Sequence, residues 1–129
     1  MLPSIDLQYL KDRAPDYELS SEAGITCVLI PKFPLPKGLD QPASDLLLRL
    51  SPGYPDVPPD MWWFHPAVRC ADGSEIPCTQ VRERHLGRDW QRWSRHLSPG
   101  QWRSGIDSLE SYLAVIRREL DAVAPKVGS

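Results

Sequence analysis

The sequence has no long hydrophobic run and no excess of one charge. No apolar stretch approaches the roughly 20 residues of a membrane helix, and the N-terminal MLPSIDLQYLKDR lacks the pattern of a secretory signal peptide. The chain carries 15 Lys and Arg against 17 Asp and Glu, interleaved, which argues against a dedicated nucleic-acid surface. We therefore expect a cytoplasmic protein that binds neither membranes nor nucleic acid.

Cysteine is scarce, at three residues, and the odd number excludes complete pairing within the chain. Without a signal peptide, free thiols in a reducing compartment are expected. Cys27 lies in the apolar segment ITCVLI and should belong to the core. Cys78, in the polar segment EIPCTQ, is the favoured candidate for a reactive thiol, although an inert, partly buried cysteine is the alternative; Cys70, near a turn in VRCADG, is the second candidate.

Proline, by contrast, is abundant: 14 of the 129 residues, most of them between positions 31 and 66. Because proline is excluded from helix interiors and central strands, these residues separate short elements. Apolar, β-branched or aromatic runs at 24–30, 45–50 and 61–64 predict strands. Joined by short turns, they indicate an antiparallel meander of about four strands. The proline-free stretch 79–98 is free to be helical.

Both ends of the sequence carry helical patterns. A short helix is predicted at 4–11, and a long amphipathic helix at 106–122. The apolar stripe of the long helix has spacings of 3, 4, 3 and 4 and consists of Ile106, Leu109, Leu113, Ile116 and Leu120. The length fits one domain, 1–129, of the α+β class, with helices packed on one antiparallel sheet.

The segment LLLRLSPGYPDVPPDMWWFHP, residues 46–66, is more specific. With Tyr54-Pro55, Pro58-Pro59 and His65-Pro66, it resembles the part of ubiquitin-conjugating (E2) enzymes that reads strand, Tyr-Pro, Pro-Pro, then a strand ending in His-Pro-Asn. The resemblance covers about twenty residues in detail and most of the chain in its order of elements. It implies a UBC-like fold of a divergent bacterial branch, similar to prokaryotic E2-like families.

The sequence departs from the E2 pattern at two places. The Asn that the family uses to stabilise the oxyanion is replaced by Ala67, and position 75, where E2 enzymes place their cysteine, is Glu75. Cys78 follows the Asp72-Gly73 turn, where the E2 cysteine loop would be. A Cys-Glu-His-His order resembles the non-standard active-site set of one prokaryotic branch, which implies the catalytic set Cys78, Glu83, His85 and His96.

The residue types of this set suit acyl transfer, which needs an exposed thiolate and a base for the incoming nucleophile. His85 and His96 are 11 residues apart, about three turns of a continuous helix, so both rings would share one face. Either could be the general base, oriented by Glu83. The alternatives are a solvated charge run and, with ligand separations of 5, 2 and 11, a zinc site.

The remaining aromatic residues are assigned mainly to packing. His65 is expected to be structural, beside the proline-rich turn. Trp90 and Trp93, three apart, would share a helix face. Trp62 and Trp63 must point to opposite sides of their strand, so one is expected to face outward, where it could contribute to a partner surface.

Three functions follow. The first is an E2-like acyl carrier in a bacterial ubiquitin-like conjugation pathway, with Cys78 receiving the modifier; the resemblance implies an E1-like adenylating protein and a ubiquitin-like modifier as partners, and no cofactor. The second is a non-catalytic E2-like adaptor, favoured by Ala67 and the shifted cysteine. The third is a zinc hydrolase or structural zinc protein that uses the same four side chains.

Overall fold

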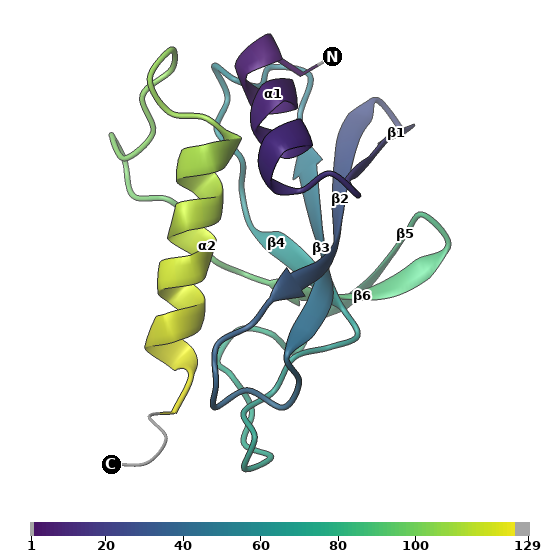
Figure 1. Cartoon of the computed structure of the whole chain (residues 1–129), viewed down its shortest axis with the longest axis vertical. Helices are drawn as coiled ribbons and strands as arrows, with labels where there is room; N and C mark the ends of the chain where they lie inside the picture. Colours follow the sequence, from purple (N-terminus) through teal and green to yellow (C-terminus); the bar gives the residue numbers. More distant parts are fainter. Residues whose placement is uncertain (1, 126–129) are drawn as a thin grey trace.

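The computed structural model describes residues 2–125 and consists of a six-stranded antiparallel sheet with two helices (Figure 1). Its elements in chain order are α1 (Ser4–Arg13), β1 (Glu18–Glu22), β2 (Ile25–Pro34), β3 (Ala43–Leu50), β4 (Trp62–His65), β5 (Arg82–His85), β6 (Arg88–Trp93) and α2 (Leu109–Val123). The strand order is β1-β2-β3-β4-β6-β5. The predicted α+β class is confirmed, with six strands rather than about four. In the described part of the chain, neither helix is long and apolar enough to cross a membrane.

Helix α2 supplies much of the main core. Its buried residues are Leu109, Tyr112, Leu113, Ile116 and Leu120, so four of the five predicted stripe positions are confirmed. The fifth, Ile106, is 65% exposed, because the helix begins at Leu109 rather than at 106. The Ser111 hydroxyl accepts a 2.9 Å hydrogen bond from the backbone N–H of Ser108, which satisfies a donor at this helix end.

The prediction of a helix within 79–98 is wrong. This stretch contains the β5–β6 hairpin, which turns at Leu86 and Gly87, both with positive φ (53° and 77°). Two such residues form the tight turn whose twist matches a two-stranded hairpin. Along β6 the side chains alternate between the two faces of the sheet: Trp90 lies on one face, and Gln91 and Trp93 lie on the other. This pattern has a period of two rather than 3.6.

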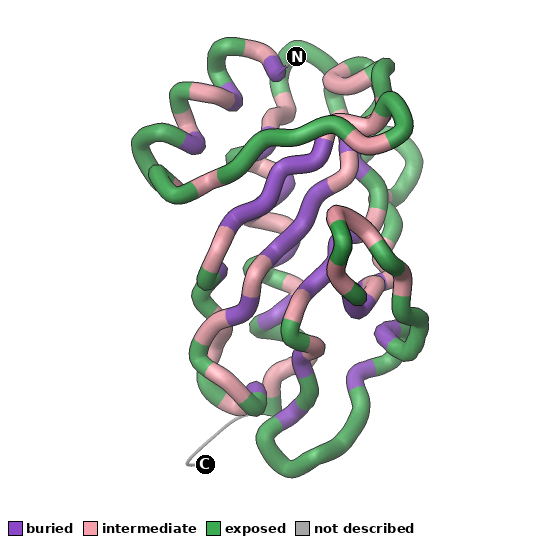
Figure 2. Tube along the Cα trace, turned by 90° about the vertical axis from the view of Figure 1, so that its right-hand side faces the viewer, coloured by how far each residue is buried: buried purple, intermediate pink, exposed green. Residues whose placement is uncertain are grey.

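The tryptophans are distributed over both faces of the sheet. Trp62 and Trp93 belong to the main core beneath the helices, whereas Trp63 and Trp90 form a second cluster with Cys27, Leu29 and Leu47. The expectation that Trp90 and Trp93 share a face is therefore wrong. Trp62 and Trp63 do point to opposite sides, but both are buried, at 1% and 3% exposure, so neither offers a free partner surface. Figure 2 shows buried segments concentrated in the strands.

The second cluster is enclosed because the sheet curls. The β1–β2 and β5–β6 hairpins extend on the side away from α2 (Figure 1). The backbone N–H of Leu86, at the tip of one hairpin, donates to Glu22 Oε2, at the tip of the other, at 3.0 Å. This contact joins two segments 64 residues apart.

Candidate active site around Cys78

Cys78 lies in the loop that precedes β5, and its side chain is exposed, as predicted. Ile76, 1% exposed, anchors this loop in the core, and the Thr79 hydroxyl donates to the Ile76 carbonyl at 2.7 Å. The Cys78 carbonyl accepts a 3.0 Å hydrogen bond from the backbone N–H of Ser94. The backbone of Cys78 is left-handed, with φ 62°. Since this conformation costs a non-glycine residue about 1–2 kcal/mol, the surrounding contacts must impose it.

Arg95 connects the Cys78 loop to helix α2. Its guanidinium donates to the Pro77 carbonyl at 2.9 Å and to Glu119 Oε1, on α2, at 2.7 Å. The same group lies over the Trp93 ring, 5.3 Å from its centroid. The backbone on both sides of the thiol is thus held by the segment that follows β6.

The other two cysteines are buried. Cys27 is fully buried in the second cluster, which confirms its assignment to the core, and burial raises the pKa of its thiol. Cys70 is 6% exposed, with its Sγ 3.8 Å from the Val123 carbonyl. Because a reactive thiol needs access to its substrate, Cys78 is the one cysteine of the three positioned to react from solvent.

Glu83 and His85 are in direct contact, as two residues on one face of β5 should be. Glu83 Oε1 lies 3.0 Å from His85 Nε2 and accepts a 2.9 Å hydrogen bond from the Trp63 indole. Its other oxygen accepts a hydrogen bond from Arg92 at 2.8 Å. The second ring nitrogen of His85, Nδ1, lies 3.2 Å from Glu22 Oε1. His85 is therefore enclosed by two carboxylates and packs edge-on against Trp63.

These contacts lower the pKa of both carboxyl groups. Burial raises the pKa of Glu83, but the hydrogen bonds from His85, Trp63 and Arg92 together outweigh it. For Glu22, the hydrogen bond from the Leu86 N–H is the largest cause of the lowered pKa; burial opposes it, and His85 and Arg49 add to it. Both groups are thus ionised at neutral pH, and the pair clamps the imidazole between the two hairpins.

His96 lies apart from this cluster, in the loop after β6. Its Nδ1 is 2.6 Å from Asp60 Oδ1, and its side chain is 62% exposed. The backbone N–H of Met61 donates to the Arg95 carbonyl at 3.1 Å, which aligns Asp60 with His96. Next to this pair is a cavity of about 200 Å³ whose lining includes Trp62, Arg95 and His96.

Two of the four predicted site residues, Glu83 and His85, are together on the hairpin. His96 lies apart from them, two residues beyond Ser94, which bonds the Cys78 backbone. The same-face argument for the two histidines fails, because β5 and β6 replace the helix on which it depended. In residues 2–125, no group of three or more His, Cys, Asp and Glu side chains is arranged to hold a metal ion, so these residues do not form the ligand set of the zinc alternative.

Several residues around the site were not anticipated. Arg92 links Glu83 to the Ser94 hydroxyl, to which its Nε donates at 3.2 Å. Asp60 is 36 residues from His96 in sequence. The alternating pattern of a hairpin that ends in Arg92 and Ser94 could have predicted the roles of these two residues. No local sequence pattern links Asp60 to His96.

His65 and Ala67 complete the surroundings. His65 Nδ1 lies 2.8 Å from the Asp89 carbonyl, and its ring contacts Trp90, as a structural residue would. The Ala67 carbonyl accepts a hydrogen bond from Gln41 at 2.8 Å, and its methyl side chain has no donor. The side chain at position 67 therefore contributes nothing to an oxyanion.

Comparison with known protein families gives a match over nearly the whole chain. The sequence profile of prokaryotic E2 family E matches residues 2–123, nearly the whole chain. No curated protein and no solved structure matches it. E2-like families act in ubiquitin-like conjugation, which agrees with the resemblance found in residues 46–66. The meander, the exposed cysteine loop after His65-Pro66 and this match lead to one conclusion: the chain belongs to prokaryotic E2 family E.

Proposed function

We propose that this protein is an E2-like acyl carrier that takes a ubiquitin-like modifier from an E1-like adenylating partner onto Cys78. The observation that carries the proposal is the exposed Cys78 thiol on a loop fixed in a left-handed conformation, in a member of a prokaryotic E2 family. A buried cysteine would need neither the loop nor the contacts from Ser94 and Arg95 that hold it.

The reaction consists of two acyl transfers. The Cys78 thiolate attacks the thioester carbonyl on the E1-like partner, forming a carbon–sulfur bond while the partner's thiolate leaves. An amine or hydroxyl of the acceptor then attacks the new thioester, and the Cys78 thiolate leaves in turn. The nucleophile loses a proton in this second step, so a general base accelerates it.

His96 suits the role of base better than His85. Both ring nitrogens of His85 already face carboxylates, and its packing against Trp63 encloses it. His96 is exposed, and among the residues that the structure describes its ring is bonded only through Nδ1, to Asp60, which leaves Nε2 to accept a proton. Asp60 orients the ring.

Glu83 and His85 then act as positioning residues. Glu83 binds Arg92, Arg92 binds the Ser94 hydroxyl, and the Ser94 N–H holds the Cys78 carbonyl. A change at Glu83 should reach the cysteine loop through this chain of contacts. The catalytic set proposed from the sequence is thereby divided by role: Cys78 is the nucleophile, His96 is the base, and Glu83 and His85 are positioning residues.

The first experiment tests the carrier. Incubation with the cognate E1-like protein, modifier and ATP should give an adduct that a reducing agent cleaves. Cys78→Ala should abolish the adduct, Cys78→Ser should trap a slower-reacting ester, and Cys70→Ala should leave it intact if the variant folds. A full-strength adduct on Cys78→Ala would show that another residue carries the modifier, and no adduct on the wild type would favour the adaptor.

The second experiment separates the histidines. Purified adduct is mixed with acceptor, and the rate of discharge is measured apart from the rate of loading. His96→Gln should slow discharge by about 10²–10⁴-fold with normal loading, as expected for loss of a general base. Asp60→Asn should slow it less, with partial rescue by Asp60→Glu. Equal effects of His85→Gln and His96→Gln on discharge, with equal stability, would contradict this division of roles.

A further inference from the structure

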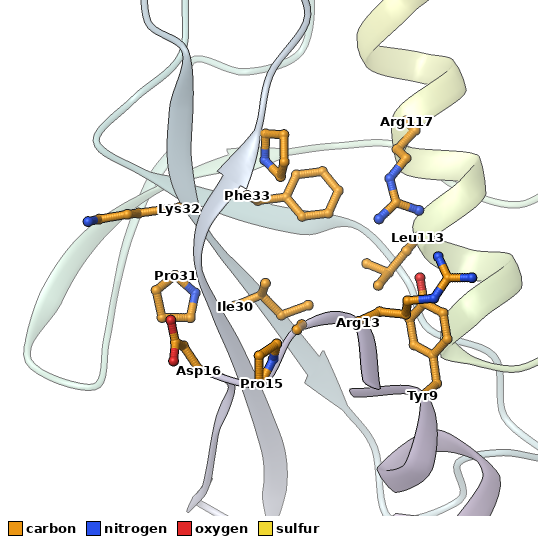
Figure 3. Close-up of a pocket in the computed structure, with 12 residues that line it drawn as sticks. Tyr9, Arg13, Pro15, Asp16, Ile30, Pro31, Lys32, Phe33, Leu113 and Arg117 are labelled. Carbon is orange, nitrogen blue, oxygen red and sulfur yellow. The ribbon is translucent and has the colours of Figure 1, made fainter. Parts of the chain in front are cut away.

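A cavity of about 310 Å³ lies on the helix side of the sheet, between the end of α1, strand β2 and α2. Its floor is apolar and consists of Ile30, Phe33 and Leu113, all buried (Figure 3). Tyr9, Arg13, Asp16 and Arg117 are among the residues around it. No residue of the Cys78 loop lines it, so the cavity is separate from the proposed acyl-transfer site.

The cavity exists because β2 is interrupted. Its pairing with β3 shifts register between Ile30 and Phe33, where Lys32 has a left-handed φ of 53°. The Lys32 backbone N–H bonds Asp45 Oδ1 at 2.9 Å instead of continuing the ladder. The interruption turns the Lys32 side chain away from the cavity (Figure 3).

Two guanidinium groups lie at the α2 side of this cavity. Figure 3 shows the ends of Arg13 and Arg117 on either side of Leu113. Arg117 also lies over the Phe33 ring, 5.2 Å from its centroid. Within residues 2–125, neither arginine forms an ion pair, whereas six of the other nine arginines are paired with carboxylates: Arg49, Arg69, Arg84, Arg88, Arg92 and Arg95.

A ligand for this cavity must match both the two guanidinium groups and the apolar floor. The guanidinium group presents a planar fork of donors that fits a carboxylate in a bidentate manner. The floor of Ile30, Phe33 and Leu113 favours an aromatic or branched aliphatic group, and the volume is at the lower end of the range for small-molecule sites. A cation would meet the two guanidinium groups, which outnumber the one lining carboxylate, Asp16, and a bare inorganic anion would make no use of the apolar lining.

We propose that this cavity binds a small apolar carboxylate, either a free organic acid or the last residue of a peptide chain. Arg13 and Arg117 hold the carboxylate, and the apolar group covers Phe33 and Leu113. The proposal does not depend on acyl transfer by Cys78.

The test uses three probes on the full chain, followed by NMR of the backbone amides. N-acetyl-L-phenylalanine represents a peptide terminus, 3-phenylpropionate a free acid, and N-acetyl-L-phenylalanine amide lacks the charge. We expect at least one acid to shift the resonances of Phe33 and Leu113 with a Kd of about 1 mM, as fits a ligand of this size. The amide should bind at least tenfold more weakly. Comparison of the two acids identifies the source of the carboxylate.

Variants locate the binding. Arg13→Gln and Arg117→Gln should each weaken binding of the acid at least tenfold, while Arg118→Gln, a neighbouring exposed arginine of α2 outside this cavity, should leave it unchanged. If one variant fails to fold, the other and the amide still decide the result. No binding of either acid, equal binding of the amide, or equal weakening by Arg118→Gln would overturn the proposal.

Discussion

The Tyr54 hydroxyl donates a 2.7 Å hydrogen bond to Asp6, across 48 residues of sequence. Asp6, only 1% exposed, uses its other carboxylate oxygen to accept the backbone N–H of Leu109 at 3.0 Å, so one side chain of α1 joins the Tyr-Pro turn to the start of α2. Burial and the bond to Asp6 raise the pKa of Tyr54, so the phenol stays protonated as the donor.

Removal of this hydroxyl should destabilise the fold. Tyr54→Phe leaves one oxygen of a buried carboxylate without its donor, and we expect a loss of about 1–3 kcal/mol in the free energy of unfolding, measured by urea denaturation. Tyr17→Phe is the control, since Tyr17 is partly buried but its hydroxyl makes no hydrogen bond with the described residues. Equal values for the two variants would show that the Tyr54–Asp6 bond contributes nothing.

Truncation of the α2 stripe should be costly where the helix packs on the sheet. Leu113, 1% exposed, should lose about 2–5 kcal/mol on replacement by Ala, as for a buried large-to-small change. Ile106→Ala should change stability by about 0.5 kcal/mol or less, because Ile106 is 65% exposed and precedes the helix. A loss under about 0.5 kcal/mol for Leu113→Ala would mean that the stripe faces solvent.

The stability that Glu22 and Glu83 contribute around His85 should depend on pH. Glu83 and Glu22 have pKa values below the ordinary 4.5, so the unfolded chain takes up protons more readily than the folded one. Their stabilisation is therefore complete above about pH 4.5 and lost as pH falls through the lower folded values. Glu83→Gln should lower the urea midpoint at about pH 7, and this effect should shrink as pH falls below 4.5 and through the lower folded pKa of Glu83. Glu18→Gln, an exposed β1 carboxyl without a side-chain partner in the described residues, is the control; a pH-independent effect of Glu83→Gln would contradict this linkage.

Thiol chemistry should distinguish the three cysteines without any partner protein. In the native protein, a thiol reagent should label Cys78 rapidly, while Cys27 and Cys70 should react at the rate of unfolding, because both are buried. Denaturant should expose all three. Cys78→Ala should remove the fast phase, and a fast phase that survives in this variant would show that a second cysteine is accessible in the folded state.

Local sequence patterns were sufficient to predict many of the strands and helices of this molecule. The apolar runs at 24–30, 45–50 and 61–64 became β2, β3 and β4, and the stripe from Leu109 to Leu120 became the buried face of α2. The contrast between ITCVLI and EIPCTQ correctly separated buried Cys27 from exposed Cys78. These features depend on the alternation or clustering of apolar residues within one segment, which sequence displays directly.

Tertiary structure decided which segments far apart in sequence contact one another. The stretch 79–98 became a hairpin because Leu86-Gly87 turns tightly and because Trp90 and Trp93 each find a core, one on each face of the sheet. The curl of that sheet buried both Trp62 and Trp63 and brought Glu22 to His85. Asp60 reached His96, and Arg117 of α2 came to lie over Phe33 of β2, through contacts between residues far apart in sequence. Local patterns determined helices α1 and α2, strands β2 to β4 and the exposed thiol. The β5–β6 hairpin and the pairing of hairpin tips, helices and loops depend on burial summed over the whole fold, and they decided which side chains surround that thiol.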